Sequence, residues 1–409
     1  MRTIFLLIMF LTLGSPRQAH AQPTDTLPAA SAPAVKKEAK KPWYETFGIR
    51  GYGQVRYNRL LETNEDLKCD QCDKSWGENG GIFLRRARIV FSGYVHPQVY
   101  IYLQPDFASS VGSSGNIAQL RDWYMDVGVD PKNEFRFRIG QSKVPYGFEN
   151  MQSSQNRLPL DRADPTNSAH SNERDIGVFF YWTPTKVRER LKMLVADGLK
   201  GSGDYGMLAF GVYNGQTANR IEANNELHTV ARFSYPFAIG SQIVETSVAG
   251  YSGKYVVISD QRSSGVAGAS DWNYVDERML GSLVLYPQPF GVLAEYNVGR
   301  GPEYISATDS VETRELSGGF VTLTYQVKLK KHIFFPFARY QVYEGGKKHE
   351  LDARSYSVKD FEFGIEWQPN KNFEFVCEYY MGDRRFEDHA KPDNEQSGNL
   401  LRLQAQLNF

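Results

Sequence analysis

The chain has 409 residues, and its 47 Lys and Arg are balanced by 47 Asp and Glu, so its formal net charge is zero. Without a basic surplus there is no general attraction to the nucleic-acid backbone, so no nucleic-acid partner is expected. Beyond the first residues, no stretch has the ~18 consecutive apolar residues of a membrane-spanning helix, which excludes a helical membrane protein.

Residues 1–21 have the pattern of a secretory signal peptide. Arg2 precedes a short apolar run, and Ala19, His20 and Ala21 form an A-x-A cleavage site. A helical anchor is the alternative, but the run is shorter than the ~20 residues that a spanning helix needs. Residues 22–46 are rich in Pro, Ala and Lys and cannot bury a core, so they predict a flexible periplasmic lead-in.

From residue 47 to residue 409 the sequence repeats one kind of element. Segments of about ten residues alternate apolar and polar side chains and are separated by turn residues, as in a transmembrane barrel. The pattern predicts an all-β fold, a transmembrane antiparallel β-barrel of about 16 strands. The predicted strands are 47–57, 82–94, 98–107, 118–129, 134–141, 174–182, 204–213, 227–236, 243–252, 273–286, 291–299, 314–326, 333–343, 358–368, 372–381 and 398–409.

The connections between these strands alternate in length. Tight turns rich in Pro or Asn occur at 95–97, 130–133, 287–290 and 369–372. Long polar segments lie between them, at 58–81, 142–173, 253–272, 300–313, 344–357 and 382–397. Short periplasmic turns and long extracellular loops are typical of outer-membrane barrels. One exception is 183–203, a long basic segment on the turn side.

The last predicted strand also indicates an outer-membrane barrel. Leu401, Leu403, Ala405, Leu407 and Phe409 fall on one face, with polar side chains between them. An aromatic residue at the very C-terminus resembles the assembly signal of outer-membrane barrels. Together with the signal peptide, this strand places the protein in the cell outer membrane, where its outer face contacts lipid.

The alternation also assigns charged residues to the lumen. Where Phe135, Phe137 and Ile139 face lipid, Arg136 and Arg138 must face water. Opposed basic and acidic walls would create a transverse field across the pore. The alternative is that these charges pair and fill the lumen. The expected basic pore-lining residues are Arg50, Arg56, Arg86, Arg88, Arg136, Arg138, Lys143 and Arg402, and the acidic ones are Glu362, Glu366, Glu374 and Glu378.

The three cysteines suggest one local disulfide. Cys69 and Cys72 form a C-x-x-C in a polar stretch, and in an exported protein such a pair favours a disulfide over free thiols or a metal site. Cys377 lies alone in a strand. The glycine pattern at 201–206 lacks a βαβ context and indicates a turn. No catalytic constellation, cofactor motif or metal-ligand spacing is present, so an enzyme is not expected.

Several stretches resemble the phosphate-selective porin O and P family. They are 138–149 (RIGQSKVPYGFE), 83–89 (FLRRARI), 102–107 (YLQPDF), 121–124 (RDWY), 174–178 (RDIGV) and 211–215 (GVYNG). The resemblance implies a trimeric porin of 16 strands, with the loop at 142–173 folded into the lumen and anions passing along basic residues. That loop has three basic residues (Lys143, Arg157, Arg162) and four acids (Glu149, Asp161, Asp164, Glu173), so strict phosphate selectivity is not expected.

These observations favour an outer-membrane porin that lets small polar or anionic solutes, phosphate among the candidates, diffuse passively through a water-filled barrel. The expected assembly is a homotrimer without a cofactor. The alternative is a barrel that conducts nothing and serves adhesion or structure.

Overall fold

The structure is a computed structural model that describes residues 42–67, 69, 81–111 and 114–409. The predicted signal peptide and most of the predicted lead-in lie outside these residues and stay predictions. Cys72 also lies outside them. Cys69 is buried and disulfide-bonded, and Cys377 has a free thiol, so the expected pairing of Cys69 with Cys72 stays a prediction.

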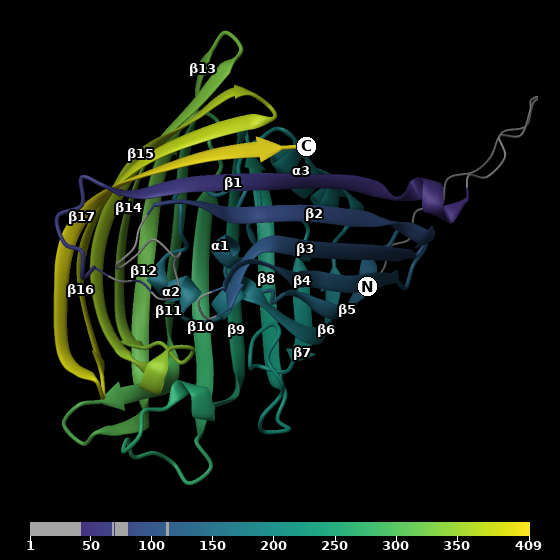
Figure 1. Cartoon of the computed structure of the whole chain (residues 1–409). Helices are drawn as coiled ribbons and strands as arrows, with labels where there is room; N and C mark the ends of the chain where they lie inside the picture. The colour runs from purple at the N-terminus through teal and green to yellow at the C-terminus, as the bar shows by residue number, and fades with distance from the viewer. Residues whose placement is uncertain (1–41, 68, 70–80, 112–113) are drawn as a thin grey trace, which may run out of the picture. The chain divides into compact units, whose positions relative to one another are not determined.

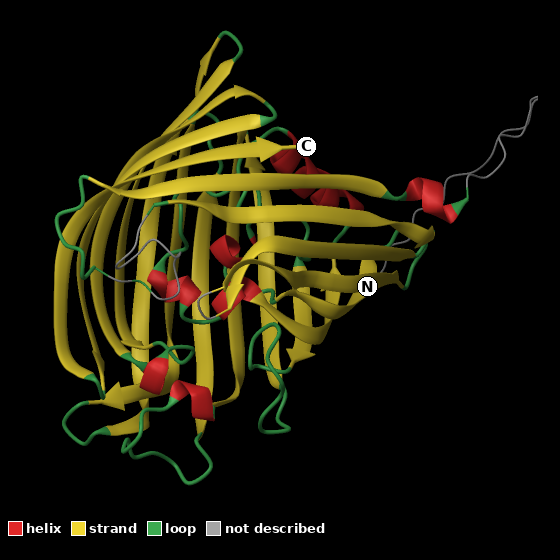
Figure 2. Cartoon of the chain, viewed as in Figure 1, coloured by secondary structure: helices red, strands yellow, loops and turns green. Residues whose placement is uncertain are grey.

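Strands make up most of the described chain (Figure 1, Figure 2). The strands are β1 Gly48–Leu60, β2 Ile82–His96, β3 Val99–Val111, β4 Ser114–Gly128, β5 Phe135–Lys143, β6 Arg174–Trp182, β7 Leu208–Tyr213, β8 His228–Ile239, β9 Gln242–Val256, β10 Asn273–Leu285, β11 Phe290–Ile305, β12 Ser310–Tyr325, β13 Val327–Leu329, β14 His332–Gly346, β15 Ser355–Asn370, β16 Phe373–Asp388 and β17 Lys391–Asn408. The helices are α1 Phe148–Met151, α2 Asp164–Asn167 and α3 Thr185–Ala196, with four short 3-10 turns at Trp43–Thr46, Ser171–Glu173, Ser259–Gln261 and Leu351–Ala353.

The sheet closes on itself. Each strand pairs antiparallel with its neighbours in sequence, and β1 pairs with both β2 and β17. β12 and β13 both pair with β14, so they occupy one place in the wall and the barrel has 16 strands. Closure matters because a sheet with free edges would leave backbone groups unpaired in lipid. The predicted 16-stranded antiparallel barrel is confirmed.

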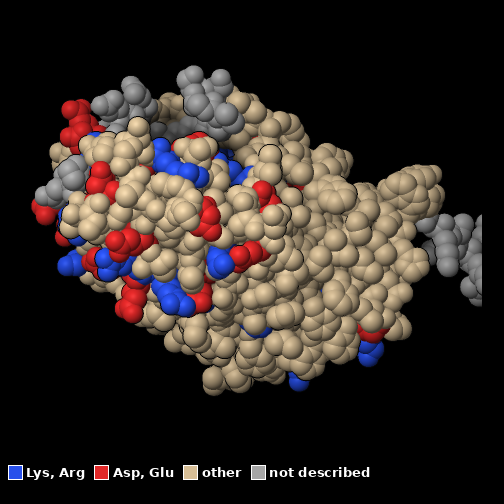
Figure 3. All heavy atoms as spheres, turned by 90° about the horizontal axis from the view of Figure 1, so that it is seen from below, with Lys and Arg blue, Asp and Glu red and all other residues tan. Residues whose placement is uncertain are grey.

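The period-2 pattern sets the two faces of the wall. In β5, Phe135, Phe137 and Ile139 are exposed while Arg136 and Arg138 are buried. The face seen in Figure 3 shows the result on a larger scale, since charged side chains gather in one region and the adjoining wall is almost free of them. An apolar outer face of this kind suits contact with lipid. Among the described residues, no helix is both long and apolar enough to cross a membrane.

Two segments expected to be loops are β-hairpins instead. The stretch 300–313 belongs to β11 and β12 and turns at 306–309, and the stretch 382–397 belongs to β16 and β17 and turns at 389–390. The prediction was wrong because these strands extend to positions where outward-facing residues are charged. Arg300 pairs with Glu277 and Arg385 with Glu387, all on the outside. At these strand ends, apolar and polar residues no longer alternate, so the sequence pattern typical of a lipid-facing strand is missing.

The basic segment on the turn side contains a helix. Within residues 183–207, here called the turn-end segment, α3 buries Val187, Leu191 and Leu194 on one face. These residues form an apolar cluster with Ile243 and Val284 of the barrel wall and Phe148 of the loop at 144–173. The turn-end segment is therefore folded against the inside of the barrel, and β7 starts at Leu208 instead of the expected 204.

Candidate functional site: the lumen

The loop between β5 and β6, residues 144–173, lies inside the barrel, as predicted, and is here called the lumen loop. Three of its acids are anchored to basic residues of the β1 and β14–β17 side. Glu149 lies 2.8 Å from Arg339, Asp161 lies 3.2 Å from Arg56, and Asp164 lies 2.8 Å from Arg384. Further partners of these acids are Arg402 for Asp161 and Lys347 for Asp164. The lumen loop is thus fastened to one side of the wall.

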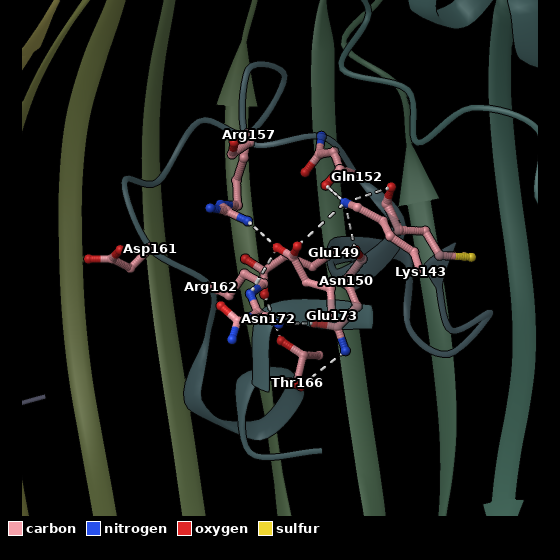
Figure 4. Close-up of polar contacts among 12 residues, drawn as sticks. Lys143, Glu149, Asn150, Gln152, Arg157, Asp161, Arg162, Thr166, Asn172 and Glu173 are labelled. Atoms are coloured by element: carbon pink, nitrogen blue, oxygen red, sulfur yellow. Dashed lines mark hydrogen bonds and ion pairs between the residues drawn. The ribbon is translucent and has the colours of Figure 1, made fainter. Parts of the chain in front are cut away.

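Two wall residues shape the start of the lumen loop. The carboxylate of Glu295 on β11 accepts hydrogen bonds from the backbone N–H groups of Phe148 (2.5 Å) and Glu149 (3.0 Å), at the start of α1. At the other end of α1, Lys143 Nζ donates to the carbonyl oxygens of residues 150, 151 and 152 at 3.0, 3.2 and 2.7 Å (Figure 4). Opposite charges at the two ends of this one turn match its unpaired N–H and C=O groups.

Toward the loop end of the barrel lies a cavity of about 550 Å³, here called the outer chamber. It is bounded by β2–β4, the lumen loop and residues 349–351. Six arginines line it against three acids. The arginines are Arg85, Arg86, Arg88, Arg121, Arg157 and Arg162, and the acids are Asp161, Glu173 and Glu350.

Two β-bulges bring extra arginines into this chamber. In β2, Gln54 of β1 pairs with Arg86 and Val55 with Leu84, so Arg85 is an additional residue. In β4, the pairing with β3 skips Arg121 in the same way. A bulge lets two consecutive side chains turn to one face. Arg85 reaches Asp161 at 3.6 Å and Arg121 reaches Asp106 at 3.6 Å, although strict alternation would send Arg85 and Arg121 to lipid.

The positive charge in the outer chamber exceeds its counter-charge. The buried carboxylate of Asp106 lies 2.8 Å from Arg88, 3.9 Å from Arg86 and 3.6 Å from Arg121. Within the described part of the chain, the buried Nε groups of Arg86, Arg121 and Arg157 have no hydrogen-bond acceptor. These donors and the surplus charge favour an anion in the chamber.

Toward the turn end lies a second cavity, of about 700 Å³, here called the inner chamber. It is bounded by β1–β6, β14–β17, the lumen loop and the end of the turn-end segment. Its basic lining residues outnumber its acids by seven to four. The bases are Arg50, Arg138, Lys143, Arg174, Lys200, Lys331 and Lys371, and the acids are Asp122, Asp197, Asp204 and Glu374.

Tyrosines hold two of these arginines in place. Tyr102 and Tyr124 are stacked with ring centroids 4.9 Å apart. The guanidinium of Arg50 lies 5.6 Å from the centroid of Tyr102, and that of Arg138 lies 4.0 Å from that of Tyr124. Stacking of a guanidinium on a ring restricts its motion while its edge can still donate hydrogen bonds.

The region between the two chambers, around Glu173, is here called the neck. Arg88 and Glu173 line the outer chamber, and Lys143 and Arg174 line the inner one. Four cations surround the carboxylate of Glu173: Arg174 at 2.5 Å, Arg162 at 3.2 Å, Arg157 at 3.8 Å and Lys143 at 3.9 Å. Figure 4 shows Arg157, Arg162 and Lys143 around this carboxylate. Glu173 is thus the central acid of the neck.

The predicted basic residues fall into four groups. Arg86 and Arg88 line the outer chamber, and Arg50, Arg138 and Lys143 line the inner one. Arg56 and Arg402 instead hold Asp161 of the lumen loop. Arg136 is paired with Asp204 (3.0 Å) and Asp126 (3.7 Å).

The predicted acidic residues do not form an open wall opposite the arginines. Glu362 pairs with Arg339 and Glu378 pairs with Arg402, each on a neighbouring strand. Glu366 pairs with Lys200 of the turn-end segment. Only Glu374 lines a chamber, where it accepts a hydrogen bond from Asn408 at 2.7 Å. The hypothesis of two opposed walls is corrected: period 2 assigns a face, but it does not reveal which cations lie next to an acid.

Sequence reasoning missed Arg85, Arg121, Arg157 and Arg162 as members of one cluster, along with the tyrosine stack. The Phe83–Ile89 stretch contains three arginines in four positions, which was a usable signal of crowding. The partners from the lumen loop carried no such signal, because its fold inside the barrel depends on the wall residues that it contacts.

A closed antiparallel barrel with an apolar outside and a charged lumen narrowed by an internal loop is the architecture of an outer-membrane porin. The chain belongs to the phosphate-selective porin O and P family, whose profile matches residues 64–409. It is accordingly a porin of the outer membrane, a channel for small solutes, and family and fold indicate a channel rather than an enzyme.

Solved structures share this fold at low sequence identity. The outer-membrane channel DcaP of Acinetobacter baumannii matches with a TM-score of 0.56 at 15% identity, covering 89% of this chain and 97% of that one. OmpF of Salmonella typhi, in complex with daunomycin, matches with 0.55 at 14% identity over 89% and 97%. An anion-selective porin from Comamonas acidovorans matches with 0.51 at 9% identity over 89% and 99%. No sequence among curated proteins matches the chain.

Proposed function

We propose that this porin gives passive diffusion to small anions, which pass from the outer chamber through the neck to the inner chamber. The observation that supports this most strongly is the outer chamber. There six arginines face three acids, and the buried Nε groups of three arginines have no acceptor in the part of the chain that the structure describes. The pore-lining role of Arg50, Arg86, Arg88, Arg138 and Lys143 is part of this proposal.

The chemistry of guanidinium groups supports it. They stay charged at any working pH and donate paired hydrogen bonds to carboxylate or phosphate oxygens. In a narrow lumen with low-dielectric walls, this surplus lowers the barrier for anions and raises it for cations. Asp106, Asp161 and Glu173 neutralise part of the charge, so the proposed pore prefers anions in general, with phosphate as one permeant among others.

Single-channel recording in a salt gradient tests this function. We expect the reversal potential of the wild-type pore to indicate anion preference, and the double variant Arg86→Gln/Arg121→Gln to lose much of it. Arg300→Gln is the matched control, because Arg300 lies on the outside of the wall. A wild-type pore that prefers cations contradicts the proposal. A barrel that conducts nothing would instead favour the adhesion or structural role.

The proposal extends to assembly. We propose a homotrimer in contact with outer-membrane lipid, exported after removal of residues 1–21. Large apolar side chains exposed along the wall, such as Phe137, Phe363 and Leu403, support lipid contact. Chemical crosslinking in native membranes tests the trimer, and N-terminal sequencing of the mature protein tests the cleavage.

A further inference from the structure

Glu173 is held in the neck by an unusual backbone. Asn172 and Glu173 both have positive φ angles, 59° and 67°, a region that side-chain-bearing residues rarely adopt. Arg121 Nη1 donates to Asn172 Oδ1 at 2.8 Å, and the Glu173 backbone N–H donates to the carbonyl of His170 at 3.1 Å. The surrounding structure therefore fixes the backbone that presents this carboxylate to the cations.

Three of the four cations around Glu173 depend on it for their charge balance. Within the described residues, Lys143, Arg157 and Arg162 have no other carboxylate within 4.0 Å, whereas Arg174 also pairs with Asp122 at 3.0 Å. Glu173 is thus the one described carboxylate that lies within 4.0 Å of all three cations. Arg157 has the fewest contacts, since its buried Nε and Nη1 have no hydrogen-bond acceptor among the described residues.

The Glu173 carboxylate contacts the four cations as a bound oxyanion would. A carboxylate carries the charge and oxygen geometry of the small oxyanions that guanidinium groups bind. The Glu173 side chain lines the outer chamber, and two of its cationic partners, Lys143 and Arg174, line the inner one. A permeating anion that reaches Arg157 from the outer chamber must share or take over contacts that Glu173 now makes.

We propose that Glu173 is a tethered counter-ion of the neck, which competes with permeating oxyanions for Lys143, Arg157 and Arg162 and so keeps their binding weak. This inference rests on the proposed anion pathway. Its consequence is a pore that passes many small anions without retaining one of them. Without the competitor, the same cations would form a site that holds an oxyanion and slows its passage.

The test is Glu173→Gln, which removes the charge and keeps the size. In bilayer recordings we expect the anion-to-cation permeability ratio to rise by ~threefold or more. Inorganic phosphate should also reduce the chloride current half-maximally at a concentration ~tenfold lower than in the wild-type pore. Glu277→Gln is the matched control, because it makes the same charge change on the outside of the wall and should alter neither quantity.

A second variant separates charge from folding of the loop. Glu173→Asp keeps the carboxylate, so its ion selectivity and phosphate block should stay close to wild type. If Glu173→Asp behaves like Glu173→Gln, the side chain acts by supporting the loop and the inference is overturned. An unchanged or lower anion preference in Glu173→Gln overturns it as well. A wild-type pore that prefers cations would refute the proposed function itself. That result comes from the wild-type recording alone, so it can be distinguished from a failure of the Glu173 inference.

Discussion

Arg339 on β14 donates a hydrogen bond from Nη1 to Glu149 Oε1 at 2.8 Å, which joins the barrel wall to α1 of the lumen loop. Both side chains are 1% exposed. The other oxygen of Glu149 accepts from the backbone N–H of Ala163 (2.9 Å) and from Thr166 Oγ1 (2.7 Å). One carboxylate therefore connects both halves of the loop to the wall.

The first prediction follows from this pair. Arg339→Gln leaves the buried carboxylates of Glu149 and Glu362 without their cation, so we expect the free energy of unfolding to fall by about 3–5 kcal/mol. Denaturant unfolding followed by tryptophan fluorescence measures it. The control is Arg300→Gln, which breaks an exposed pair and should cost at most ~1 kcal/mol. Equal losses in both variants would show that the Arg339 cluster has no special role.

The second prediction concerns a paired cation of the inner chamber. Arg138 donates to both oxygens of Asp126, from Nε at 2.7 Å and from Nη2 at 2.9 Å, so the pair is close to neutral. Arg138→Gln should uncover the negative charge of Asp126 and shift the reversal potential in a salt gradient toward cations. Adding Asp126→Asn should restore the wild-type value. If the double variant stays shifted, Arg138 contributes to selectivity beyond the charge of its pair.

The third prediction concerns the seam where the barrel closes. Gly51 N–H donates to the carbonyl of Phe409 at 2.8 Å, and Phe409 N–H donates back at 3.0 Å. A Cβ added to Gly51 would lie 2.6 Å from Cζ of Phe409 and 2.4 Å from the carbonyl oxygen of Arg88. Deletion of Phe409 and Gly51→Val should therefore both reduce the yield of heat-modifiable, folded barrel on gels. Phe373→Ala, on the exposed face of β16, is the control expected to fold normally.

The fourth prediction is a pH dependence at the tips of two hairpins. His389 Nδ1 lies 2.8 Å from Asp309 Oδ1, and this hydrogen bond raises the pKa of His389 above its usual value. A raised pKa in the folded state means that the contact stabilises the hairpin tips at acidic pH and loses this effect as the pH rises through the raised pKa. An NMR titration of His389 should show the raised pKa, and Asp309→Asn should return it toward the ordinary value. If the pKa of His389 is the same in the Asp309→Asn variant as in the wild type, this explanation is wrong.

The barrel could be predicted because lipid imposes a simple rule on every strand that crosses it. Side chains that face lipid must be apolar, as Phe135, Phe137 and Ile139 of β5 are. This alternation was enough to predict the number of strands and the side chains on each face of the wall. The rule fails where lipid ends. Because Arg300 and Arg385 are charged and face outward, the sequence pattern predicted β11 and β16 to end earlier than they do.

The lumen was less predictable because its contacts join distant parts of the chain. The bulges at Arg85 and Arg121 leave no mark in a period-2 pattern, yet they add two cations to the outer chamber. The pairing of Asp161 with Arg402 spans 241 residues and depends on the path of the lumen loop. Single side chains could be assigned to the lumen from sequence, but their partners required the fold.

The turn-end segment has an electrical consequence. It borders the inner chamber near its exit and is fastened across the lumen by the pairing of Lys200 with Glu366. On the proposed anion path, the neck at Glu173 and the passage beside the turn-end segment are two resistances in series, with the inner chamber between them. Lowering the resistance of the neck alone raises the current only until the other passage limits it. The current through a Glu173 variant therefore underestimates the change in resistance at the neck itself.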